Sequence, residues 1–262
     1  MSIAYKITLK SKKIWYNNAM RFFYFILYII IFVFPIIVQA QVLDIDTDND
    51  GLSDEQELNI YFTDPKNSDT DGDGYLDGEE IKNNYSPLFG DKKKLIQVDS
   101  DKDYLNDAWE IILGTGLMNP DSDYDKFLDG TEVAAGYDPL DSQPNKLPKT
   151  IKISLTKQNL TYTFGEKTLG SFPLSSGVKT MPTPKGNFTV LAKIPVKHYG
   201  GVGYNYPNTK WNLQFKPSFF VHGAYWHNKF GQTMSHGCVN VAYENMEALY
   251  WWAQIGTPVI IE

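Results

Sequence analysis

The chain has 262 residues, of which 42% are hydrophobic and 15% aromatic, enough for a buried core and for more than one domain. Its formal charge of −7 conceals two opposite halves. Residues 42–145 hold 27 of the 31 acidic residues and 7 of the 24 Lys and Arg, a formal −20, whereas residues 146–262 carry a formal +8. No basic run is interleaved with aromatic residues, which argues against nucleic acid as a partner. The acidic half is expected to attract cations, and the basic half to tolerate an anionic substrate.

The first 40 residues have the pattern of an export signal. Residues 1–21 are basic and lack acidic side chains, and an apolar run of 17 residues follows from Phe22 to Val38. Val38-Gln39-Ala40 offers the small residues that a signal peptidase recognises. We therefore expect a cut after Ala40 that removes residues 1–40 as a signal peptide. An uncleaved signal anchor is the alternative, and the membrane is a partner only in that case. Either way the remainder is expected to be exported, to the periplasm, cell wall or cell surface.

Residues 42–143 repeat one spacing of acidic residues four times. In each repeat Asp occupies positions 1, 3, 5 and 9, and Glu occupies position 12. Oxygen ligands at this spacing are typical of a calcium loop. The predicted metal ligands of loops one to four are Asp46, Asp48, Asp50, Asp54 and Glu57; Asp69, Asp71, Asp73, Asp77 and Glu80; Asp99, Asp101, Asp103, Asp107 and Glu110; and Asp121, Asp123, Asp125, Asp129 and Glu132. Structural Ca²⁺ is therefore predicted here, and a disordered acidic linker is the alternative.

The residue at position 6 distinguishes the four loops. The chain must turn there through a positive φ, which favours glycine. Loops one and two have Gly51 and Gly74, whereas loops three and four have Tyr104 and Lys126. We therefore expect a strained or altered turn, and weaker calcium binding, in loops three and four.

The whole acidic region resembles thrombospondin type 3 repeats, over about residues 44–142. The segments between the loops are too short for the helix pairs of EF-hands, and Asp-Pro and Asn-Pro turns recur between them. The resemblance implies an irregular chain wrapped around calcium, with little hydrophobic core, in which metal supplies most of the folding energy. Chelation is then expected to loosen this region and to leave residues 151–262 folded.

After a short Pro-containing linker, residues 144–150, the pattern changes to the alternation of β-strands. Strands are predicted over residues 151–155, 160–164, 188–191, 219–221 and 258–261. Residues 244–254 have the apolar spacing of an amphipathic helix that ends before Gly256. Residues 151–262 are therefore predicted to form a mainly β domain with one main helix.

Cys238 is the single cysteine of the chain, so an exported form cannot use it in an internal disulfide. It lies in the segment Ser235-His236-Gly237-Cys238-Val239-Asn240, and a second His-Gly pair, His222-Gly223, precedes it. A thiol nucleophile needs a base and donors for an oxyanion. His222 is the candidate base, and the amides around Gly237 and Cys238 are candidate donors. Ser235 and His236 can line the pocket, and Asn240 can hold the local turn or a substrate group.

Two other roles for this cysteine are open from the residues alone. It can be a small buried hydrophobic residue, the commonest state of a free cysteine. It can also be a zinc ligand together with His222, His227 and His236, although zinc sites normally show more closely spaced ligand pairs.

The segment around Cys238, together with His222-Gly223, resembles the signature of YkuD-type L,D-transpeptidases. Further similarities to this family lie at 183–188, 225–227, 230–231 and 256–259, so that the resemblance covers about residues 150–262. Asn240 stands where the family often has Arg, which bears on substrate detail. The resemblance implies a β-sandwich of the L,D-transpeptidase type with one main helix.

The resemblance also implies a two-step acyl transfer on peptidoglycan stem peptides. Cys238 would form a thioester with the third residue of a tetrapeptide stem and release D-alanine, with His222 as the base, oriented by the carbonyl of Gly223. An amine acceptor would then resolve the thioester. Tyr225, Trp226 and Asn240 would contact substrate, and the chemistry would need no cofactor. Water as acceptor would make an L,D-carboxypeptidase, and a non-catalytic calcium-dependent wall-binding module is the remaining alternative.

Overall fold

The computed structural model describes residues 45–201 and 203–262. The chain divides into two units, Met1–Asp44 and Ile45–Glu262, and only the second lies in the described part. The predicted signal segment, residues 1–40, is outside it. Within residues 45–201 and 203–262, every helix is too short or too polar to span a bilayer.

Short helices alternate with the four acidic loops, and each begins at position 9 of its loop. They are α2 (Asp54–Gln56), continued by the π-helical turn η2 (Glu57–Tyr61), α3 (Asp77–Lys82), α4 (Asp107–Leu113) and α5 (Asp129–Ala135), with a 3₁₀ turn η3 (Leu95–Gln97) between α3 and α4. Acidic residues occupy the first turn of each α-helix, where the helix dipole favours negative charge. Gly114 and Gly136, at φ 91° and 85°, end α4 and α5.

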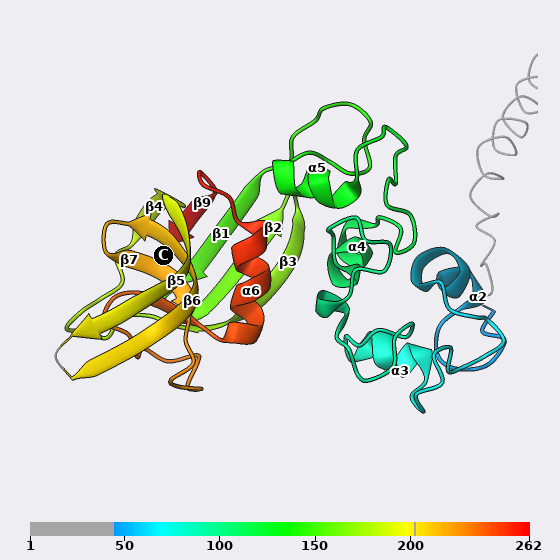
Figure 1. Ribbon diagram of the computed structural model, residues 1–262, viewed down its shortest axis with the longest axis horizontal. Coiled ribbons are helices and arrows are strands. Elements are labelled where there is room, and N and C mark those ends of the chain that lie inside the picture. The colour runs from blue at the N-terminus through cyan, green and yellow to red at the C-terminus, as the bar shows by residue number, and fades with distance from the viewer. Residues whose placement is uncertain (1–44, 202) are drawn as a thin grey trace, which may run out of the picture. The chain divides into compact units, whose positions relative to one another are not determined.

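The C-terminal part is one nine-stranded sheet with a single α-helix (Figure 1). Its strands are β1 (Lys149–Ser154), β2 (Asn159–Phe164), β3 (Lys167–Ser175), β4 (Gly186–Thr189), β5 (Ala192–Gly201), β6 (Tyr204–Lys216), β7 (Phe219–Gly223), β8 (Val239–Val241) and β9 (Pro258–Ile261). The strand order is β4-β9-β1-β2-β3-β8-β7-β6-β5. The pairs β1–β9 and β7–β8 are parallel, and the other pairs are antiparallel.

Strand β3 joins the two halves of this sheet. Its residues up to Pro173 pair with β2, whereas Leu174 and Ser175 pair with β8. The sheet therefore turns within one strand, which lets it curl around a shared core. The predicted fold class, a mainly β domain with one main helix, is confirmed.

Helix α6 (Tyr243–Trp252) packs on this sheet, as Figure 1 shows, and buries Met246 and Leu249 completely. It is shorter than predicted because Ala253 is already extended, at φ −67° and ψ 140°. The long β5–β6 hairpin was not predicted. Its burial pattern lacks the regular alternation from which a half-buried strand is recognised.

The third and fourth repeats contribute directly to the core of the β domain. Leu105, Trp109, Leu113 and Val133 belong to the same hydrophobic cluster as the buried residues of β1–β3 and α6. The Trp109 ring meets Tyr162 edge-on at a centroid distance of 6.2 Å. The expectation of a repeat region with little hydrophobic core is therefore wrong for this pair of repeats.

Candidate functional site

Cys238 and His222 line the same cavity, of about 150 Å³. His222 is near the end of β7, and Cys238 directly precedes the neighbouring parallel strand β8, where Asn240 pairs with His222. Parallel pairing thus brings together two residues that are sixteen positions apart in the sequence. The other lining residues are Tyr199, Tyr204, Tyr206, Ser218, Trp226, Met234, Ser235, His236 and Asn240.

A hydrogen bond fixes the protonation pattern of His222. Its Nδ1 lies 2.9 Å from the carbonyl oxygen of Gly223. Since a carbonyl only accepts, Nδ1 carries the proton and Nε2 of the neutral ring is free to act as a base. Burial lowers the pKa of His222 to about 4, although the Gly223 hydrogen bond opposes the shift. The ring of Tyr199 stacks on the imidazole at a centroid distance of 4.6 Å and holds its orientation.

Cys238 is half-buried, with Sγ 3.9 Å from the carbonyl oxygen of Ser218. Burial raises the pKa of Cys238 to about 11, against the opposing effects of the Phe220 amide and the Lys197 charge. The resting pair is therefore a neutral thiol and a neutral imidazole. Such a pair can act by general-base catalysis, in which the thiol proton moves to the imidazole as the sulfur attacks.

Ser235 shapes the loop that carries the thiol. Its hydroxyl donates to the carbonyl of Cys238 and accepts a 3.1 Å hydrogen bond from the Gly237 amide. The Gly237 amide, one of the two predicted oxyanion donors, is thereby engaged within the loop. Gly237 has a φ of 110°, and a Cβ there would lie 2.9 Å from the Phe219 ring, so this position needs glycine.

Thr183 is a buried part of the site that sequence reasoning did not assign. Its hydroxyl donates to the carbonyl of Gly237 and accepts from the amide of Gly177, both at 2.9 Å. A Cβ on Gly177 would lie 2.9 Å from the Cα of Gly237, so two glycines allow the backbones to approach. The sequence signal was the Thr-Pro-x-Gly element itself, whose partners only the fold reveals.

Aromatic rings form one wall of the cavity. Trp226, predicted to contact substrate, stacks on Tyr206 with centroids 3.9 Å apart, and His236 stacks on Tyr204 at 4.7 Å. Tyr225 is not among the lining residues, and its hydroxyl donates to the carbonyl of Pro207. The substrate contact of Tyr225 stays a prediction.

The amide of Asn240 lies 3.2 Å from Nε2 of His227, a partner that the sequence did not suggest for this histidine. Across residues 45–201 and 203–262, the groups of side chains that converge as metal ligands consist of Asp and Glu alone. The zinc alternative for Cys238 and the neighbouring histidines therefore lacks the required geometry.

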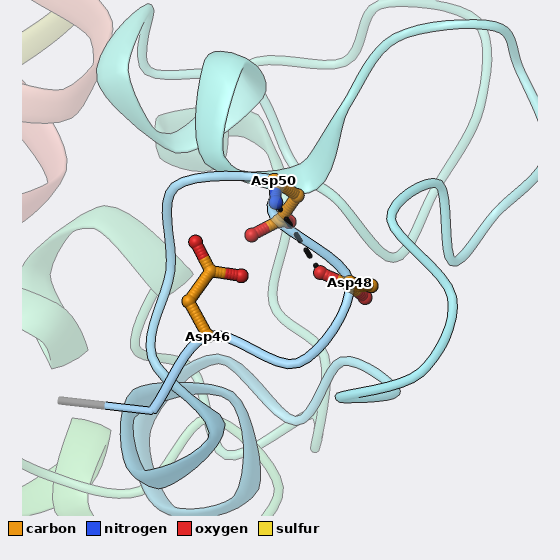
Figure 2. Close-up of side chains that lie close together, drawn as sticks. All are labelled: Asp46, Asp48 and Asp50. Carbon is orange, nitrogen blue, oxygen red and sulfur yellow. Dashed lines mark hydrogen bonds between the residues drawn. The ribbon is translucent and has the colours of Figure 1, made fainter.

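The four acidic loops each bring three carboxylates together. The Asp side chains at positions 1, 3 and 5 lie within 4.8 Å of one another in every loop. Figure 2 shows this for Asp46, Asp48 and Asp50, whose side chains face one another inside loop one. In loop one, the backbone amides of Asn49 and Gly51, at positions 4 and 6, donate to the carboxylate of Asp46 at position 1.

Each loop also contains buried carboxylate oxygens without any hydrogen-bond partner. They are Oδ2 of Asp48, Asp71, Asp101 and Asp123 at position 3, Oε2 of Glu57, Glu80 and Glu132, and both Oε atoms of Glu110 at position 12. Burial and the neighbouring carboxylates raise the pKa of Glu57 and Glu132 to about 7 and that of Glu80 to about 8. Buried, uncompensated acids are unfavourable, and a cation with oxygen ligands would compensate them. The residues of all four loops fit Ca²⁺.

The Asp at position 9 has a different role from its neighbours. In each loop its two oxygens accept from the backbone amide and the hydroxyl of the Thr or Ser at position 2, at 2.5 to 2.9 Å. The four residues are Asp54, Asp77, Asp107 and Asp129. Their oxygens close the loop, which argues against the ligand role predicted for them, although Asp77 also lies near Asp50 and Glu57.

Loops three and four adopt the same turn as the glycine loops. Tyr104 and Lys126 have φ values of 80° and 83°, beside 101° and 96° for Gly51 and Gly74. The turn therefore keeps its shape in loops three and four. Holding a residue other than glycine at this φ costs roughly 1–2 kcal/mol of backbone strain at each position.

The loops also associate in pairs, through a carboxylate at position 5 of one loop and a glycine amide at position 10 of the next. Asp50 accepts from Gly78 at 3.1 Å, and Asp103 accepts from Gly130 at 2.9 Å. A Cβ on Gly130 would lie 2.5 Å from the carbonyl oxygen of Asp103, so the close approach depends on glycine.

Comparisons with known proteins find similarities for both parts of the chain. Residues 148–261 match the family model of the L,D-transpeptidase catalytic domain, YkuD, and residues 46–68 and 69–84 match the bacterial TSP3 repeat. The probable L,D-transpeptidase 3 of Mycobacterium tuberculosis is 34% identical over 117 residues, which are 38% of this chain and 40% of that protein. The putative L,D-transpeptidase YkuD of Bacillus licheniformis is 26% identical over 137 residues, 51% of this chain and 79% of that protein.

Among solved structures, an L,D-transpeptidase from Mycobacterium smegmatis aligns with a TM-score of 0.42 at 26% identity, covering 45% of this chain and 59% of that one. The chain thus spans less than two thirds of the mycobacterial proteins that it matches. Residues 148–261 are thus similar to the L,D-transpeptidase catalytic domain of the YkuD type, and segments similar to the bacterial TSP3 repeat precede them in the chain.

Proposed function

We propose that this chain is an exported L,D-transpeptidase that remodels peptidoglycan, with Cys238 as nucleophile and His222 as base. The observation that carries the proposal is the hydrogen bond from Nδ1 of His222 to the Gly223 carbonyl. It leaves Nε2 unprotonated in a residue that lines the same cavity as the thiol. The L,D-transpeptidases named above support the same reaction class.

In the first step the sulfur attacks the carbonyl carbon of the third residue of a tetrapeptide stem, and the thiol proton moves to Nε2 of His222. The Gly237–Cys238 peptide is trans, and its carbonyl is held by Thr183, so the Cys238 amide points the opposite way and can meet the oxyanion. The C–N bond to D-alanine then breaks, and the leaving amine takes the proton from His222. A thioester on Cys238 remains.

In the second step an amine of a neighbouring stem attacks the thioester. His222 accepts the proton of that amine, and the sulfur leaves and regains a proton. The formal +8 of residues 146–262 suits an anionic wall polymer.

Calcium is the second part of the proposal. The loop carboxylates at positions 1, 3, 5 and 12 hold Ca²⁺, which neutralises the buried acids and orders the repeats. Export of the chain follows from the wall location of the substrate.

The test is mass spectrometry of the full chain, incubated with disaccharide-tetrapeptide and calcium, with Cys238→Ala as the matched control. Cysteine-dependent loss of D-alanine with a cross-linked dimer is the expected result. Loss of D-alanine with tripeptide as the sole product identifies the L,D-carboxypeptidase instead. Equal behaviour of the wild type and Cys238→Ala overturns the enzymatic proposal and favours the wall-binding module.

A further inference from the structure

Helix α4 carries a candidate calcium ligand next to a core residue of the β domain, residues 149–261, which is called the transferase domain below after its proposed function. Glu110 is position 12 of loop three, and Trp109 is its neighbour in the chain. Consecutive residues of a helix point about 100° apart, so one helix can present Glu110 to the loop and Trp109 to the β-sheet. Leu113, one turn later, lies in the same core cluster as Trp109. A seven-residue helix moves as one body, so the position of Glu110 sets the position of both apolar side chains.

The acid on this helix is the one that most needs a cation. Glu110 is completely buried, and neither of its carboxylate oxygens has a hydrogen-bond partner. The neighbouring charges that act most strongly on it are those of Asp101, Asp103, Asp107 and Asp129, all of them acids. In the other three loops, only one oxygen of the position 12 Glu is both buried and without a partner. Burial of a carboxylate among other carboxylates is unfavourable without a bound cation.

We propose that loop three, through Asp99, Asp101, Asp103 and Glu110, holds a Ca²⁺ ion that is a structural ion of the transferase domain. Its occupancy stabilises the sheet that carries Cys238 and His222. The inference rests on the calcium part of the proposed function and goes beyond it. Loop three lies outside the segments that match the TSP3 repeat, and the ion is assigned to the catalytic half of the chain.

A second route leads from loop three to the same domain through α5. Asp103 accepts a hydrogen bond from Gly130 in the first turn of α5. At the other end of α5, the Ala134 carbonyl accepts from Lys149, at 3.0 Å, and from the Gln254 amide. The same Lys149 ammonium donates to the carbonyl of Trp252 at 3.1 Å and so connects the ends of α5 and α6. Loop three is therefore tied to the transferase domain by a core contact and by a polar chain.

Loops one and two provide an internal comparison. The buried repeat residues of the shared core cluster all come from the third and fourth repeats: Leu105, Trp109, Leu113 and Val133. Ile96, just before loop three, and Ile112 are partly buried against the cluster. Leu52 of loop one is buried but lies outside that cluster. Removing calcium from loop one should therefore loosen its own repeat and leave the sheet unaffected.

The test is hydrogen exchange, followed by mass spectrometry, on the full chain in calcium chloride or in EGTA. Residues 149–175, which form β1 to β3, are the readout. Calcium at a hundred times its dissociation constant should slow their exchange by about 100-fold if opening of the sheet releases the ion. Unchanged exchange of residues 149–175, with faster exchange at 99–113, overturns the proposal.

Two matched variants locate the effect, since Glu110→Gln and Glu57→Gln each remove one buried charge at position 12. Glu110→Gln should speed exchange at residues 149–175 in calcium, whereas Glu57→Gln should speed it at 46–84 alone. Equal behaviour of the two variants at 149–175 contradicts the assignment. The wild-type comparison stands even where Glu110→Gln fails to fold. Equilibrium dialysis counts the bound calcium ions. It therefore distinguishes a loop that does not bind calcium from a bound ion that does not stabilise residues 149–175. Neither measurement depends on transpeptidase activity.

Discussion

Thr183 links three backbone segments around the nucleophile with one hydroxyl group. It holds the Gly237 carbonyl and the Gly177 amide, and it is almost completely buried. Thr183→Val keeps the shape of the side chain and removes both hydrogen bonds. We expect kcat to fall by about 100-fold, because a small displacement of the Cys238 amide misaligns the oxyanion donor.

The same substitution should leave KM nearly unchanged, because Thr183 is not among the residues that line the cavity. Steady-state release of D-alanine measures both constants. Thr183→Ser keeps the hydroxyl and should restore most of kcat. Equal losses in the Ser and Val variants would instead indicate a packing role for the methyl group.

The resting state of the thiol can be tested by its pH dependence. Burial raises the pKa of Cys238 to about 11, so the reactive thiolate is scarce at neutral pH. The rate of alkylation by iodoacetamide should therefore rise about tenfold per pH unit between pH 7 and 10. Because the pKa of His222 is lowered to about 4, this residue stays neutral throughout that range.

Cys238 is the single cysteine, so mass spectrometry reports on this thiol alone. A rate that reaches a plateau below pH 8 would mean that thiolate and imidazolium already form an ion pair in the free protein.

The loops show which elements a sequence can predict. The convergence of Asp99, Asp101 and Asp103 follows from local spacing, since three carboxylates at alternate positions of a tight turn face one point. The sequence did not predict that Asp107 accepts hydrogen bonds from Ser100. A serine at position 2 is equally compatible with a position 9 acid that binds metal. Ligand spacing alone does not show which acids the backbone has already engaged.

In the candidate active site, too, some residues could be predicted from the sequence and others could not. Cys238 and His222 were predicted because glycine and histidine surround them within short segments. Thr183 and Tyr199 were missed because their partners lie in other segments of the chain, Gly177 and Gly237 for Thr183 and His222 for Tyr199, and only the fold brings them together.

The turn in loop three provides a prediction at the level of one element. Tyr104 has a φ of 80°, and its side chain is 81% exposed, so the ring gains little from packing. Tyr104→Gly should raise the free energy of unfolding in saturating calcium by about 0.5–1 kcal/mol, because strain relief exceeds the added entropy of the unfolded chain. Urea denaturation measures the change.

Gly74→Ala is the matched control at position 6 of loop two. Its new Cβ would have no atom within 4 Å, so any loss of stability is conformational. A loss of stability in Tyr104→Gly would show that the exposed ring has a stabilising contact after all.

At the scale of the whole molecule, charge and hydrophobic packing have opposite effects on the repeat region. Its acidic residues repel one another, whereas its apolar residues pack into the β domain. Residues 42–145 carry a formal −20 and should repel one another without a bound cation. Leu105, Trp109, Leu113 and Val133 nevertheless pack into the β domain. The sequence alone predicted that chelation leaves residues 151–262 folded. The shared core leads us to expect in addition that loss of calcium lowers the stability of both halves.

Trp109 is the side chain through which that coupling can be broken. It is 6% exposed and meets Tyr162 in the shared core, so Trp109→Ala should lower the free energy of unfolding by about 3–5 kcal/mol through the cavity it leaves. Trp251→Ala, at a 69% exposed position on α6, should change the free energy of unfolding by less than about 0.5 kcal/mol.

Calorimetry of the full chain with and without calcium measures the stability of both variants. In the wild type and in Trp251→Ala, calcium should raise the melting temperature of the transferase domain. In Trp109→Ala this increment should shrink, because α4 no longer transmits the ion's binding energy to the sheet. An increment equal to that of the wild type would mean that the connection from α5 through Lys149 is sufficient by itself.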